Sequence, residues 1–205
     1  MVLSSVEAPR VLIVGTGPSI EKVEFPSLPG VHIIAVNHAV NWLPHSDSFF
    51  SMDTAPAIMR LIDRPRRAVQ YYHAVPDGWQ QQRRPWVRYL RRVMGMGVRG
   101  SQDRLAESPG EIHAGNSVYG ALNLAYHWRP KKIAFVGLDA TDTGYAYDRR
   151  KGPAWSLQHL PDLFFSAGPQ LEKAGIEVVN GSLNSKVTCF VRWAPQKAIE
   201  WIANE

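Results

Sequence analysis

Five residues near the start of the chain have the composition of a phosphate-binding loop. Residues 11–14 are apolar, as in a strand covered on both faces, and they lead into Gly15, Thr16, Gly17, Pro18 and Ser19. Glycine permits positive φ and close approach of the backbone to a ligand, and Pro-Ser suits the first turn of a helix, whose free N–H groups attract anions. The loop lacks the third glycine of the dinucleotide fingerprint and the Gly-Lys-Ser/Thr of a Walker loop. We predict nucleotide binding here, with a plain tight turn as the alternative.

Three more polar residues stand where predicted strands end. They are Asn37 after residues 31–36, Asp53 after residues 47–52 and Asp139 after residues 132–138. Open parallel sheets bind ligands outside the carboxyl ends of their strands, so we expect these side chains at one edge. Asp53 could bind a sugar hydroxyl, a ribose or a metal ion, or it could instead cap a helix predicted for residues 54–62.

A further polar pair stands at the head of a predicted helix. Asn116 and Ser117 are both good N-cap residues, and apolar side chains recur at helical spacing after them, up to residue 128. The small residues Gly120 and Ala121 would let this helix lie close to the sheet. Strands and helices alternate along the chain, which predicts an α/β, Rossmann-like, mostly parallel sheet with helices on both faces.

The middle of the chain is rich in arginine and aromatic residues and predicts an insert at about residues 60–110. Within it, residues 86–94 have helical spacing, with Trp86 on the apolar face and Arg88, Arg91 and Arg92 largely off it. This predicts either a solvated lid helix, which we favour, or a nucleic-acid contact in which arginines bind phosphates and aromatic rings stack on bases. Residues 95–100 read as a mobile tail.

Composition sets broad limits on the protein class. The chain of 205 residues with 45% apolar content predicts a single domain over residues 1–205, and the net charge of +5 suits an anionic substrate or a polyanionic partner. Cys189 is the single cysteine, so no internal disulfide can form, and the apolar run 187–191 predicts that it lies in a buried strand rather than acting as a nucleophile. Without a transmembrane run or a signal-peptide pattern, we expect a cytoplasmic protein without membrane contact.

Several short motifs, taken in order, resemble the bacterial sialyltransferases of glycosyltransferase family 42. The likeness extends to related Gly-Pro-Ser proteins, which include archaeal hydroxymethylpterin diphosphokinases. The motifs cover most of the chain: the loop at residues 15–19, Asn37, the helix start at residues 116–119, Gly137-Leu138-Asp139, residues 145–148, and His159 ahead of a late helix.

The resemblance implies roles for particular residues. Gly17, Ser19, Asn37, Asn116 and Ser117 would hold the nucleotide of a nucleotide-sugar donor. His159 would be the general base on the acceptor hydroxyl, because imidazole titrates near neutrality, and Tyr145 would assist the leaving phosphate without a metal ion.

Two departures from the family pattern affect this reading. Thr141 stands where the family has a second leaving-group tyrosine, so Tyr147 or Arg149 would have to substitute for it. Asp53 replaces an asparagine, and a carboxylate beside a phosphate repels it unless it is protonated or bridged by Mg²⁺.

Three hypotheses therefore stay open. The favoured one is a glycosyltransferase that moves a sugar from a nucleotide sugar to an acceptor hydroxyl, on a glycan or on a nucleic acid such as a modified DNA base; Mg²⁺ is compatible with it but not required. The second is a Mg²⁺-dependent nucleotidyl or pyrophosphoryl transferase that uses Asp53 and Asp139. The third is a non-catalytic nucleic-acid-binding module built on the arginine-rich segment.

Overall fold

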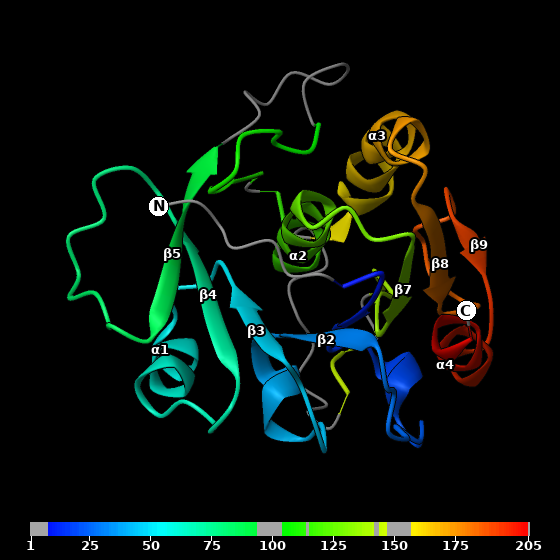
Figure 1. Cartoon of the computed structure of the whole chain (residues 1–205), viewed down its shortest axis with the longest axis horizontal. Helices are drawn as coiled ribbons and strands as arrows, with labels where there is room; N and C mark the ends of the chain where they lie inside the picture. Colours follow the sequence, from blue (N-terminus) through cyan, green and yellow to red (C-terminus); the bar gives the residue numbers. More distant parts are fainter. Residues whose placement is uncertain (1–7, 94–103, 114, 142–143, 147–156, 205) are drawn as a thin grey trace.

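One parallel β-sheet organises the chain (Figure 1). The computed structural model describes residues 8–93, 104–113, 115–141, 144–146 and 157–204. Within these residues the sheet has nine strands, all parallel, in the order β6-β5-β4-β3-β2-β1-β7-β8-β9. The strands are β1 (Arg10–Val14), β2 (Val31–Val36), β3 (Ser48–Ser51), β4 (Gln70–Val75), β5 (Val87–Val93), β6 (Glu111–His113), β7 (Lys132–Val136), β8 (Glu177–Gly181) and β9 (Val191–Arg192).

Helices cover both faces of this sheet. The described helices are α1 (Pro56–Asp63), α2 (Ser117–His127), α3 (Leu160–Lys173), α4 (Pro195–Ala203) and the short 3-10 helices η1 (Pro18–Ile20) and η2 (Asn37–Asn41). Side chains alternate between the faces of a strand, so Ile13 of β1 packs in the core with α2 and α3, and its neighbour Leu12 packs in the core with α1 and α4. The predicted α/β, Rossmann-like fold is confirmed.

The order of the strands reverses between β1 and β7. From β1 the chain adds strands on one side as far as β6, and it returns through α2 to place β7 on the other side of β1. Residues Arg10–Val14 pair in register with Lys132–Val136. Ligands of open α/β sheets bind at such a switch point, outside the carboxyl ends of the strands.

The arginine-rich segment joins the sheet, so the prediction of a lid helix at residues 86–94 is wrong. Residues 87–93 form β5, which pairs with β4 from Tyr71↔Val87 to Val75↔Arg91. The helical spacing of Trp86, Leu90 and Val93 misled the prediction, because pairing with the edge of β4 satisfies the backbone and overrides local periodicity. The predicted tail at residues 95–100 lies outside the described residues.

Smaller predictions also need correction. The helix expected after Ser19 is only η1, which has three residues. Helix α1 is preceded by Ala55 as its N-cap, so Asp53 does not cap it. Cys189 is exposed rather than in a buried strand; partial burial of its sulfur nevertheless raises the pKa of the thiol to about 11, which keeps it protonated at neutral pH.

No helix among the described residues is long and apolar enough to cross a membrane.

Helix α2 lies against the sheet as its small residues predict. A Cβ atom added at Gly120 would stand 2.8 Å from two ring carbons of Phe50 and 3.1 Å from the sulfur of Met52. Phe50 is fully buried in β3, so its ring has little room to move. The absence of a side chain at Gly120 therefore sets how closely the helix approaches β3.

We predict that Gly120→Ala lowers the free energy of unfolding by about 1–3 kcal/mol, as expected for an overpacked core. Helix propensity alone would favour alanine, so a loss isolates the packing effect. Urea denaturation measures it. Adding Phe50→Leu should recover part of the loss, and equal costs of Gly120→Ala in the two backgrounds would contradict this packing.

Candidate functional site

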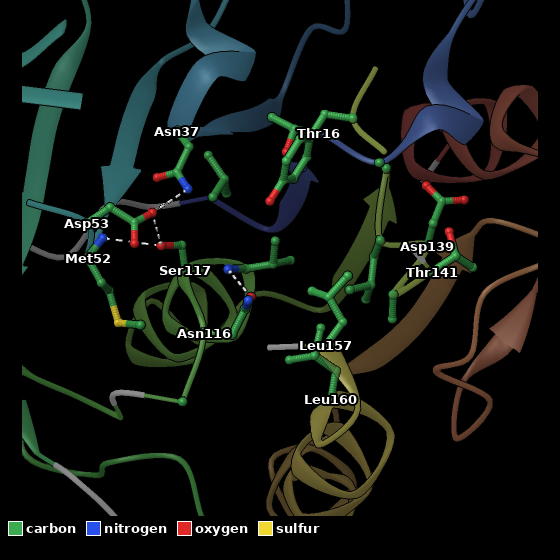
Figure 2. A pocket seen from close by; sticks show the side chains of 18 of the residues that line it. Thr16, Asn37, Met52, Asp53, Asn116, Ser117, Asp139, Thr141, Leu157 and Leu160 are labelled. Atoms are coloured by element: carbon green, nitrogen blue, oxygen red, sulfur yellow. Dashed lines mark hydrogen bonds between the residues drawn. The ribbon is translucent and has the colours of Figure 1, made fainter. Parts of the chain in front are cut away.

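A cavity of about 510 Å³ lies at the carboxyl edge of the sheet (Figure 2). Its walls come from the ends of β1, β2, β3 and β7, from the residues before and at the start of α2 and α3, and from residues 144–145. Apolar side chains such as Leu157 and Leu160 form one wall, and polar groups line the rest. The elements that the sequence predicted to converge on a ligand do converge on one cavity.

The glycine-rich loop packs against the loop that follows β7. Gly15 N–H donates to the Val136 carbonyl at 2.8 Å, and Gly17 N–H donates to the Gly137 carbonyl at 2.9 Å. A Cβ at Gly15 would stand 2.5 Å from the Gly137 oxygen, so glycine is required here for contact between two backbone segments. Neither Gly15 nor Gly17 uses the positive φ that glycine permits. Their two amides are bonded within the protein, while Thr16, Gly17 and Pro18 line the cavity.

Asp139 fills the space beside this loop. Its Oδ2 accepts from the backbone N–H and hydroxyl of Ser19 at 3.2 and 2.8 Å, and its Oδ1 accepts from the Ser182 hydroxyl at 2.6 Å. A Cβ at Gly17 would lie only 2.0 Å from Oδ2. Asp139 is 6% exposed. This carboxylate thus occupies the position where the sequence predicted a bound anion, and it holds β1, β7 and β8 loops together.

A second carboxylate, Asp53, is held on the opposite side of the cavity (Figure 2). Its Oδ2 accepts from Asn37 Nδ2 at 2.7 Å and from the Ser117 hydroxyl at 3.2 Å. The side-chain Oδ1 of Asn37 in turn accepts from the Ser51 hydroxyl at 2.6 Å. Asn37 has φ of 53°, a left-handed conformation that asparagine adopts more readily than most residues. The amide of Asn37 therefore orients Asp53, and among the described residues no hydrogen bond occupies Asp53 Oδ1.

The start of α2 completes this polar side of the cavity. Asn116 is the N-cap, and its side-chain oxygen accepts from Val118 N–H at 2.8 Å. Ser117 also accepts from the Met52 N–H at 3.3 Å, so it joins α2 to the end of β3. Asn116 and Ser117 both line the cavity, as predicted for a nucleotide contact.

Buried His73 contacts the backbone of Asp53 on this polar side of the cavity. Its Nε2 lies 3.2 Å from the Asp53 carbonyl oxygen. Burial lowers the pKa of His73, the hydrogen bond to Asp53 opposes this shift, and the charge of Arg92 adds to it. His73 is accordingly neutral at pH 7, with Nε2 as the donor.

Arg92 lines the cavity. Among the described lining residues, no other side chain is a lysine or an arginine. The Arg92 guanidinium donates to the Met52 carbonyl at 3.4 Å, beside Asp53. Arg91 is instead exposed and bonds Asp77 and Glu111, and the Arg88 guanidinium stands 6.0 Å from the ring centre of Tyr72. The three arginines predicted to share a nucleic-acid face therefore have three different surroundings, because they lie on a strand rather than a helix.

His159 stands at the start of α3 on the rim of the cavity. Its Nε2 lies 3.0 Å from the Gly115 carbonyl, which can only accept, so Nε2 is the donor and, in the neutral imidazole, Nδ1 is the nitrogen with the lone pair. Tyr145 lines the same cavity and is 38% exposed. Thr141 also lines it. The predicted helpers Tyr147 and Arg149 lie outside the described residues.

Asp53 and Asp139 are too far apart to share one metal ion. They follow β3 and β7, which are three strand spacings apart, or about 14 Å. Each carboxylate is bonded to its own neighbours, and two oxygens on one Mg²⁺ lie within about 4 Å of each other, since each Mg–O distance is about 2.1 Å. Among the described residues, no group of three or more acidic, histidine or cysteine side chains could hold a metal ion. The structure therefore does not bring Asp53 and Asp139 together as ligands of one Mg²⁺ ion.

Sequence reasoning missed the roles of Ser182 and Arg92. Ser182 follows β8 and has no neighbouring motif, so nothing in the sequence connects it with Asp139. The sequence predicts Arg92 on a lid helix or in a nucleic-acid contact with its neighbours, and only strand alternation, which puts Arg92 and Arg91 on opposite faces of the sheet, could have separated the two.

Comparison with known proteins adds no relative: no family model matches the chain, and neither the curated proteins nor the solved structures contain a match.

We predict that Asp139 is needed chiefly for stability. Asp139→Ala leaves the buried hydroxyl of Ser182 unpaired, at a cost of about 1–3 kcal/mol, and removes the partner of the half-buried Ser19 donors, which water can partly replace. Ser182→Ala removes one bond and should cost only about 1 kcal/mol. Urea denaturation compares the two variants. A fully stable Asp139→Ala protein without turnover would instead make Asp139 a catalytic residue.

Proposed function

We propose that the protein is a nucleotide-sugar-dependent glycosyltransferase that acts by direct displacement. The observation that carries this proposal is His159, whose committed Nε2–H leaves a basic Nδ1 at the rim of a polar cavity. A base placed this way can take a proton from an acceptor hydroxyl. The resemblance to family 42, which reaches the same histidine, supports the same chemistry.

In the proposed reaction, the acceptor oxygen forms a bond to the anomeric carbon while its proton moves to His159 Nδ1. The bond between the anomeric carbon and the donor phosphate breaks, and the phosphate oxygen takes the electron pair. The Tyr145 hydroxyl donates to this leaving oxygen, and Arg92 neutralises the phosphates. Asp53, held by Asn37 and Ser117, offers Oδ1 to hydroxyl groups of the donor.

The phosphates are expected near Arg92 and the start of α2 rather than in the glycine-rich loop. Amides of that loop are bonded to Gly137 and to Asp139. A second anion placed beside Asp139 would be repelled by its carboxylate. The cation of Arg92 and the positive end of α2 offer the opposite environment.

The first test is a thermal-shift screen against nucleotides and nucleotide sugars, followed by turnover with the donor that binds. A ligand at 100 times its Kd adds about 2.7 kcal/mol of stability, which such a screen detects. Turnover that persists in EDTA is expected. Turnover that needs Mg²⁺ and releases pyrophosphate would replace this proposal with the nucleotidyl transferase.

We predict that His159→Ala lowers kcat by about 10²–10⁴-fold, the usual contribution of a general base, with donor affinity nearly intact. Steady-state kinetics and calorimetry measure the two quantities. The matched control is His45→Ala, because His45 is exposed and bonds Asp47 before β3, away from the cavity. Wild-type kcat in His159→Ala would refute the assigned base.

Arg92→Gln should weaken nucleotide binding by about 10- to 100-fold, since a hydrogen bond to a charged group contributes about 1.5–3 kcal/mol. Affinity for the parent nucleoside, which lacks phosphates, should stay unchanged. Arg91→Gln is the control on the same strand, because Arg91 is not among the residues that line the cavity. If both variants bind nucleotide like the wild type, Arg92 does not bind phosphate.

A further inference from the structure

The positive charge of the chain comes from one segment. Residues 60–92 contain nine arginines, no lysine and two aspartates, a net charge of +7, whereas the whole chain carries +5. The rest of the chain therefore carries −2. Arg92 lines the cavity and Arg91 is paired with acids, so the excess charge must be explained by the remaining arginines.

Several of these arginines belong to the segments that follow α1 and precede β5, and both elements lie beside β4 (Figure 1). Arg84 Nε donates to Asp63 at 2.7 Å, and Trp86 Nε1 donates to the Ile62 carbonyl at 2.9 Å. Gln70 Nε2 at the start of β4 lies 3.4 Å from the Trp86 carbonyl. These contacts tie three elements into one surface. We call it the arginine edge and define it by Arg64, Arg67, Arg83, Arg84 and Trp86.

Most of the charge on this edge has no acidic partner. Arg64, Arg67 and Arg83 are exposed. Among the described residues, no carboxylate lies within salt-bridge distance of these three side chains, and Asp63 is bonded to Arg84. The Arg83 guanidinium rests over the Tyr89 ring, 5.3 Å from its centre. Among the described residues, the edge thus presents three exposed guanidinium groups that form no salt bridge.

Trp86 gives the same surface a flat apolar face. The residue is 43% exposed, which is unusual for so large a side chain, and its indole N–H is already satisfied by Ile62. The bond fixes the ring, so a stacking partner would lose little side-chain freedom. A fixed aromatic ring among arginines is the arrangement by which proteins bind single strands, with bases on the ring and phosphates on the cations.

We propose that the arginine edge binds single-stranded nucleic acid. Arg64, Arg67 and Arg83 contact successive phosphates, for which the planar guanidinium is a better match than an ammonium group, and Trp86 stacks on a base. An anionic membrane fits this edge less well, since membrane-surface segments insert a face of several apolar side chains and the edge offers one indole.

This site is separate from the cavity. The edge lies at the amino ends of β4 and β5, and the cavity lies at the carboxyl edge of the sheet. The inference therefore goes beyond the proposed transferase and does not depend on it.

The test is fluorescence anisotropy with a labelled mixed-sequence DNA 20-mer and the matching RNA, in 50–250 mM NaCl. Three phosphate contacts on a single strand predict a slope of log K against log salt of about −2. The triple variant Arg64→Ala, Arg67→Ala, Arg83→Ala should weaken binding at least tenfold and remove most of the slope. The matched control is Arg91→Ala, which should bind like the wild type.

Trp86→Leu separates stacking from charge. It should weaken binding to the DNA 20-mer by about 5- to 100-fold, within the range measured for base–aromatic stacking, and leave binding to an abasic strand of the same length unchanged. Circular dichroism of each variant checks that it is folded, and donor turnover of the triple variant should equal that of the wild type.

The proposal is overturned if the protein does not bind the 20-mer at 50 mM NaCl, or if the triple variant binds it like the wild type. It is also overturned if vesicles containing phosphatidylserine are bound and the oligonucleotides are not. Tighter binding to a duplex than to a single strand would also overturn the proposal, because the bases of a duplex are not free to stack on Trp86.

Discussion

The close contact between the loops after β1 and β7 is the constraint on which the site depends. At a switch point, the segments that follow two adjacent parallel strands run to opposite sides of the sheet and normally leave a crevice between them. Here Gly15 and Gly17 bring their backbone onto Gly137, and Asp139 bonds the Ser19 amide, so the protein's own groups occupy part of this crevice. The cavity consequently opens beside this contact, toward β2 and β3 and under the starts of α2 and α3.

The two carboxylates at this edge of the sheet have different surroundings. Asp139 has three hydrogen bonds and is nearly buried, so its charge is satisfied within the protein. Asp53 is held through one oxygen by Asn37 and Ser117, which leaves the other for a ligand. In the proposed transferase, a donor phosphate near Asp53 would need a compensating positive charge, for which Arg92 and the amino end of α2 are the nearest candidates.

The sequence predicted the fold and the edge of the sheet at which the polar residues gather, but not the partners of those residues. Apolar runs followed by polar residues correctly placed Asn37, Asp53 and Asp139 at one edge, and Asn116 is the N-cap of α2 as expected. The composition of the glycine-rich loop could not reveal that its anion is Asp139, because the two segments are 120 residues apart and meet only through parallel pairing of β1 and β7. The helix predicted for residues 86–94 was wrong for a similar reason. Local spacing favoured a helix, but pairing with the edge of β4, which the sequence does not reveal, makes the segment a strand.

The sheet keeps the cavity and the arginine edge at a fixed separation. Strand β5 runs from the residue after Trp86 to the residue after Arg92, a length of about 20 Å at 3.3 Å per residue. Both of its neighbours are parallel strands in one hydrogen-bonded ladder, so the two ends cannot approach each other without breaking the sheet. Groups this far apart with no shared partner act independently. If both proposals hold, a polymer bound at the arginine edge would have to span that length to enter the cavity, whereas a small acceptor would reach His159 without touching the edge.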